Sequence, residues 1–113
     1  MEKLNNNHYR VLYITCPNMN DAENIARVLV NNRVAACINI IPNVKSIYTW
    51  QDKVEESEEV LLIVKTVEDN LEMLEEIVKK YHPYTVPEII SWGINSGNTE
   101  YLKWMNDVTN VSV

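Results

Sequence analysis

The side chains that could do chemistry in this chain are few and lie far apart in the sequence. The thiols are Cys16 and Cys37, and the imidazoles are His8 and His82. Thiolate and imidazole are ligands that copper favours, and a cysteine beside a histidine can also act as a nucleophile with its base. Nothing in the local sequence supports that second arrangement. Cys16 and His82 therefore remain candidates for metal ligation, with burial of the thiol as a small hydrophobe as the alternative for Cys16.

The other candidates are charged or rigid segments. Cys37 lies within the apolar run AACINI, which predicts a place in the core. Residues 55–59, EESEE, form an acidic cluster that could bind a hard cation or form a solvated strand. Lys65 closes an apolar strand and is expected to reach solvent or an anion. The segment YHPYTVPE, residues 81–88, holds two prolines that fix the backbone around Tyr84.

Composition and charge exclude several classes of function. The chain has 113 residues, of which 46% are hydrophobic and 23% charged, which fits one globular domain. Its net charge of −6 disfavours partners with phosphate backbones and anionic membranes. No apolar run approaches the roughly 20 residues that cross a bilayer, and two cysteines without CxxC spacing predict a reduced, cytoplasmic protein. With two glycines in all, a glycine-rich phosphate loop is not expected.

Hydrophobic periodicity places these residues on secondary-structure elements. The elements expected are a strand at 9–15, a helix at 18–32, strands at 34–42, 44–50 and 58–66, a helix at 67–81, a strand at 88–95 and a helix at 99–108. Asn20 and Glu23 are a plausible capping pair for the first helix. The inward residues of the second helix are predicted to be Leu71, Leu74, Ile77, Val78 and Tyr81. Those of the last helix are Tyr101, Leu102 and Met105.

The order β-α-β-β-α-β predicts a ferredoxin-like α+β domain with an additional C-terminal helix. The domain is expected to span residues 9–108, after a disordered arm at 1–8 and before a tail at 109–113. Residues 34–66 form a long β-hairpin whose strands exceed the usual 3 to 10 residues. A two-layer domain of this size cannot cover such strands, so the overhang is expected to pair with something outside the domain.

The chain resembles the CutA family of divalent-cation tolerance proteins. The resemblance covers residues 10 to about 107. It rests on TCPN at 15–18, on the run from Arg33 to Thr66, and on the segment HPYTVPEIISWGINSGNTEYLKWM that begins at His82. It implies a compact homotrimer in which the hairpin strands pair between subunits, and no enzymatic activity. Asp52 stands where the family has a glycine in the hairpin turn, and Asp tolerates the positive φ needed there.

The resemblance also implies a site for copper or another divalent cation, although not a complete one. Bacterial members place a cysteine on the first strand and two adjacent histidines before Pro-Tyr. Here Ile14 occupies the cysteine position, and Tyr81-His82 replaces the histidine pair. We therefore carry over His82 as a metal ligand, with Cys16 as a substitute, and expect weak binding.

A ligand cleft is the second expectation that follows from the resemblance. A small molecule or an ion would bind a rigid wall with little loss of entropy. The residues expected to build this cleft with His82 are Tyr48, Trp50, Lys65, Tyr84 and Glu88. They could instead only hold subunits together. Three functions remain open: a trimeric protein of metal homeostasis, a PII-like small-molecule sensor, and a trimeric scaffold for other proteins.

Overall fold

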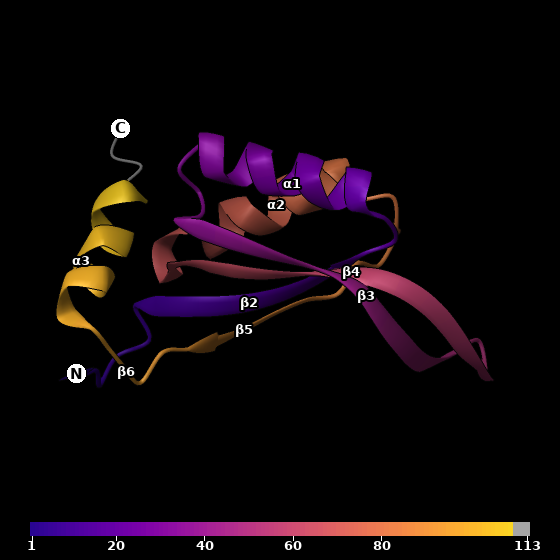
Figure 1. The fold of residues 1–113 in the computed structure, drawn as a ribbon, viewed down its shortest axis with the longest axis horizontal. Helices are drawn as coiled ribbons and strands as arrows, with labels where there is room; N and C mark the ends of the chain where they lie inside the picture. The colour runs from indigo at the N-terminus through magenta and orange to yellow at the C-terminus, as the bar shows by residue number, and fades with distance from the viewer. Residues whose placement is uncertain (110–113) are drawn as a thin grey trace.

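The computed structural model describes residues 1–109 and shows a four-stranded antiparallel sheet with two helices on one face (Figure 1). The sheet order is β3-β4-β2-β5, so the first strand of the domain lies inside the sheet and the hairpin forms one edge. The elements of the domain are β2 (Tyr9–Cys16), α1 (Met19–Asn31), β3 (Cys37–Trp50), β4 (Lys53–Val67), the short 3₁₀ helix η1 (Glu68–Asn70), α2 (Leu71–Tyr81), β5 (Ile89–Gly93) and α3 (Thr99–Val108). The expected ferredoxin-like α+β fold is therefore confirmed.

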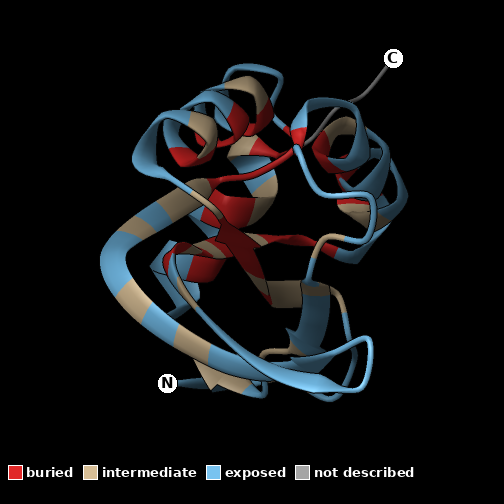
Figure 2. Cartoon of the chain, turned by 90° about the vertical axis from the view of Figure 1, so that its right-hand side faces the viewer, coloured by how far each residue is buried: buried red, intermediate tan, exposed pale blue. Residues whose placement is uncertain are grey.

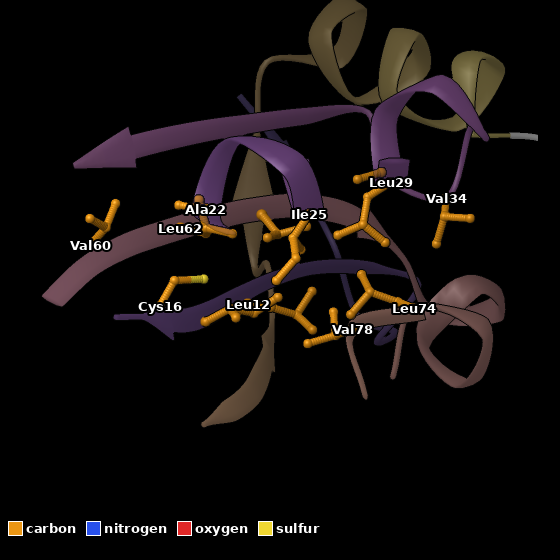
Figure 3. Close-up of a cluster of buried hydrophobic side chains, with 13 residues drawn as sticks. Leu12, Cys16, Ala22, Ile25, Leu29, Val34, Val60, Leu62, Leu74 and Val78 are labelled. Atoms are coloured by element: carbon orange, nitrogen blue, oxygen red, sulfur yellow. The ribbon is translucent and has the colours of Figure 1, made fainter. Parts of the chain in front are cut away.

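The core fills the space between the sheet and the pair α1 and α2, as Figure 3 shows. Alternate residues of the strands enter it because successive side chains point to opposite faces. The fully or almost fully buried members include Leu12, Ile14, Cys16, Ile25, Leu29, Leu62, Val64, Leu74 and Val78. α3 packs at one end of the sheet through Leu102 and Met105.

The face of the sheet turned away from α1 and α2 is covered by no element among the described residues, and we call it the open face. The alternation of β2 and β4 places Tyr13, Ile63 and Lys65 on it, opposite in direction to their buried neighbours. β5 adds Ile90 and Trp92, both exposed. The rings of Tyr13 and Trp92 meet edge to face with centroids 4.8 Å apart.

The hairpin of β3 and β4 extends well past the helices (Figure 1). Its turn is Gln51-Asp52, and both residues have positive φ, 50° and 63°, as a two-residue turn between twisted strands requires. The structure thus confirms that Asp52 supports the turn. Most of the arm is exposed in this single chain (Figure 2), including Trp50 at 53% and Val54 at 75% of their surfaces.

Helix capping differs from the prediction. The N-cap of α1 is Asn18, whose side chain accepts a hydrogen bond from the backbone N–H of Asp21 at 2.8 Å. The proposed pair of Asn20 and Glu23 was wrong, because both positions lie inside the helix. The capping motif has the expected chemistry but begins two residues earlier, directly after Pro17.

Three side chains expected in the interior lie elsewhere. Tyr81, at the last turn of α2, and Tyr101, in the first turn of α3, are exposed. Cys37 is only partly buried and projects from the open face rather than into the core. The periodicity predicted the correct buried face of each helix. Residues near the helix ends, such as Tyr81 and Tyr101, follow that periodicity but lie beyond the core.

The N-terminal arm is partly ordered, contrary to the expectation that residues 1–8 are disordered. Glu2–Lys3 (β1) pairs antiparallel with Ser96–Gly97 (β6), and the N–H of Leu4 donates to the carbonyl of Asn95 at 2.8 Å. Thr109, the first residue of the expected tail, is buried. Residues 110–113 of that tail lie outside the described residues. No helix within the described part of the chain is long and apolar enough to cross a membrane.

Candidate functional site

His82 is the C-cap of α2 and is held by the backbone on both sides of its ring. Its Nδ1 accepts a hydrogen bond from the N–H of Tyr84 at 3.1 Å. Because that nitrogen accepts, the proton lies on Nε2, which donates to the carbonyl of Thr15 at 2.7 Å. The side chain is 7% exposed. Both ring nitrogens are therefore engaged in tying the end of α2 and the following loop to the end of β2.

Cys16 lies in the core beneath α1, as Figure 3 shows, and has no exposed surface. Burial raises the pKa of its thiol to about 12, and the nearby carboxylates of Asp21 and Glu59 act in the same direction. Such a thiol stays protonated at neutral pH. Because Cys16 is fully enclosed by apolar neighbours, its surroundings favour the alternative that it packs as a small hydrophobe.

The residues present do not fit the expected copper site. A metal bound by His82 would have to displace one of its two backbone hydrogen bonds, and the thiol of Cys16 points into the core. Within residues 1–109, no three His, Cys, Asp or Glu side chains are grouped so that they could hold a metal ion. In the single chain, His82 and Cys16 therefore stabilise the fold, His82 through its two hydrogen bonds and Cys16 through packing in the core.

Three of the residues expected to build the cleft lie near one another, at the end of the sheet from which the hairpin arm leaves. The hydroxyl of Tyr84 donates to Glu59 Oε2 at 3.3 Å, and Ser57 Oγ donates to the hydroxyl of Tyr48 at 3.4 Å. Burial raises the pKa of Tyr84, and Glu59 and Tyr48 raise it further. The ring of His82 packs against that of Tyr84 with centroids 4.9 Å apart. Tyr48, Tyr84 and His82 thus do converge.

Lys65 does not join this group within one chain. It pairs in register with Val11 and Cys37, whereas His82 contacts the carbonyl of Thr15, which is opposite Leu61. Four residues of strand separate the two places by about 13 Å. The ammonium of Lys65 donates to the side-chain oxygen of Asn39 and lies 4.0 Å from the sulfur of Cys37.

The remaining two cleft residues lie at the margins. Trp50 is the last residue of β3, in register with Lys53 beside the hairpin turn. Glu88 is exposed directly before β5. Neither makes a side-chain hydrogen bond to the group around Tyr84 within the described residues.

Glu59 is the residue of this site that the sequence did not single out. It is one of five residues in the cluster EESEE, which was expected to bind a hard cation or to form a solvated strand, and yet it is only 8% exposed. The other glutamates of the cluster are exposed on the arm. A usable signal was its place as the last charged residue before the apolar run Val60 to Val64, where the strand enters the body of the domain.

Comparison with known proteins identifies the class to which this fold and site belong. The family model of the CutA1 divalent ion tolerance protein matches residues 10–108. The chain belongs to that family, as the sequence motifs predicted. Among solved structures, the divalent cation tolerance protein of Thermus thermophilus has a TM-score of 0.89 at 48% identity, covering 90% of this chain and 99% of that one. The CutA1 structure of Oryza sativa has a TM-score of 0.89 at 41% identity, covering 93% and 96%.

Curated relatives come from bacteria, animals and plants. The divalent-cation tolerance protein CutA of Thermus thermophilus is 50% identical, over 88% of this chain and 96% of its own length. The CutA homolog of Xenopus laevis is 50% identical over 85% of this chain, and human protein CutA is 44% identical over 86%. This chain spans 64% of the Xenopus protein and 54% of the human one.

Proposed function

We propose that this protein serves divalent-cation tolerance as a homotrimer that binds a ligand between its subunits and carries out no catalysis. The observation that carries the proposal is the uncovered apolar surface of the open face together with the bare hairpin arm. The family supplies the cation-tolerance role.

The open face is too apolar to be left to water. Ile41, Ile90 and Trp92 are each more than two fifths exposed, and Ile63 and Tyr13 lie between them. Contiguous exposed apolar surface on this scale is typical of a protein interface. The arm adds Ile47, Trp50 and Val54 on strands whose outer edge, β3, has no partner strand among the described residues. An edge strand of this length offers its free backbone groups to another chain.

A closed ring of identical copies satisfies these surfaces at once. In a cyclic trimer, the arm of each copy contacts a different surface of the next copy, and no edge strand is left unpaired. The group of Tyr48, Tyr84 and His82 lies where the arm leaves the body of the domain, so the neighbouring copy would add the second wall of a ligand cleft.

The protein is proposed to bind copper or another divalent ion weakly, through residues other than Cys16 and His82. The engaged nitrogens of His82 and the buried thiol of Cys16 support this placement. The same two observations support a binding role over catalysis, since neither side chain is poised as nucleophile or base.

Sedimentation of the purified protein at micromolar concentration tests the assembly. We expect a mass three times that of the 13.1 kDa chain. Ile90→Lys places a charge on the open face and should shift the mass toward the monomer. Met73→Lys is the matched control, because Met73 is exposed on the outer side of α2. A wild-type protein that sediments as a 13.1 kDa monomer would overturn the proposal.

A further inference from the structure

Glu59 is a buried carboxylate without a cation. Glu59 is 8% exposed. In the described part of the chain, its carboxylate has one hydrogen-bond partner, the hydroxyl of Tyr84 at 3.3 Å. No salt bridge among residues 1–109 includes it. Buried charges in proteins are paired or bind ions, because an isolated one is costly to remove from water. The carboxylate of Glu59 therefore lacks a positively charged partner.

We propose that Glu59, with Tyr48 and Tyr84, forms a receptor for an ammonium group. The carboxylate supplies the charge, the tyrosine and Ser57 hydroxyls supply further oxygen acceptors, and the two aromatic rings can face a cation. A metal ion fits less well. Hard cations take six or more oxygen ligands, usually with several carboxylates, and among the described residues Glu59 belongs to no group of three His, Cys, Asp or Glu side chains that could hold a metal ion.

Lys65 has the complementary deficiency. It lies on the open face with Glu59, because both occupy odd positions of the unbroken strand β4. Its ammonium contacts only the side chains of Asn39 and Cys37 and forms no salt bridge within the described residues. Six residues of strand place the two charges about 20 Å apart, so they cannot meet within one chain.

Between copies they can meet. In a ring of identical subunits, one end of the open face of each copy packs against a different surface of the next. The ammonium group then comes from Lys65 of a neighbouring copy, and this source rests on the proposed self-association. The alternative source of the same chemistry is a small primary amine, which needs no second copy.

The test begins with Glu59→Gln, which keeps the shape and removes the charge, and with Lys65→Ala, which removes the ammonium. Glu55→Gln is the matched control, since Glu55 lies on the same face of β4 but is exposed on the arm. Breaking a buried charge pair weakens association by at least about 30-fold. We expect that loss in both variants, no greater loss in the double variant, and none in Glu55→Gln, all measured by sedimentation at varied concentration.

Chemical rescue identifies the source. If the ammonium is that of Lys65, n-butylamine restores association in Lys65→Ala but not in the double variant. If the source is a free amine, Glu59→Gln associates as the wild type does, and calorimetric titration shows n-butylamine binding to the wild type that is lost in Glu59→Gln. That titration works equally on a monomer, so failure of the proposed assembly would leave it decisive.

Two results overturn the receptor. One is a Glu59→Gln protein that associates normally while the wild type binds no n-butylamine. The other is association that depends on Glu59 but is unaffected by Lys65→Ala, again with no n-butylamine binding. Because the titration uses the wild-type protein, a Glu59→Gln chain that failed to fold would not protect the proposal.

Discussion

Replacing His82 with alanine distinguishes a structural histidine from a metal ligand. The ring joins the carbonyl of Thr15 to the N–H of Tyr84, and it does so while almost completely buried. In the variant, the N–H of Tyr84 can turn to water because Tyr84 is exposed, whereas the carbonyl of Thr15 is left in a buried place. We therefore expect His82→Ala to lower stability while copper binding stays the same.

The size of the effect follows from these contacts. An unsatisfied buried acceptor costs about 1–3 kcal/mol, and the void left by the ring adds to it, for a total of about 3 kcal/mol. Unfolding in guanidinium at one fixed protein concentration measures this loss, and a competition titration against a chromophoric chelator measures copper affinity. His8→Ala is the control histidine variant, because within residues 1–109 the ring of His8 makes a single hydrogen bond, to Asn106 at 2.7 Å.

The opposite pattern would refute the reasoning. If His82→Ala unfolds at the denaturant concentration of the wild type and loses copper binding, the ring is a metal ligand and the two backbone contacts contribute little. The conclusion that Cys16 and His82 do not form the copper site would then be wrong.

Two further predictions concern the last residue of β2, Cys16, and the N-cap of α1, Asn18. Because burial holds the pKa of Cys16 at about 12, against 9.0 for a free thiol, the native protein keeps its proton above pH 9 while the unfolded chain loses it. Stability should therefore fall as pH rises from 9 toward 12, and iodoacetamide at pH 8 should label Cys16 only after unfolding; rapid labelling of the native protein, located by peptide mass, would contradict this. Asn18→Ala should cost about 1 kcal/mol by loss of the N-cap, measured by chemical unfolding, whereas Asn20→Ala should cost much less; equal costs would return the cap to Asn20.

Most of the fold was readable from the sequence because the signals were local. The β-branched and aromatic residues of YRVLYIT and the long apolar run of β4 predicted the strands, and the 3.6-residue stripes predicted the helices. The boundaries failed where a tertiary contact decides them. The arm at residues 1–8 carries no strand pattern, and its order depends on pairing of Glu2–Lys3 with Ser96–Gly97, which are distant in sequence. Tyr101 carries the helical spacing of an inward residue, but the body of the domain ends before it.

The candidate site was less predictable because charge and burial are set by position in the fold. Residue type made His82 and Cys16 candidate metal ligands. Only the structure shows that both ring nitrogens of His82 are hydrogen-bonded to the backbone and that Cys16 is enclosed in the core. Conversely, five adjacent acidic or polar residues look alike in sequence. Where the long strand passes from the free arm into the body of the domain, one of them, Glu59, is carried out of water while its neighbours are not. A buried carboxylate is stabilised by a positively charged partner, and because none of the salt bridges among residues 1–109 includes Glu59, we expect that partner to come from outside the chain.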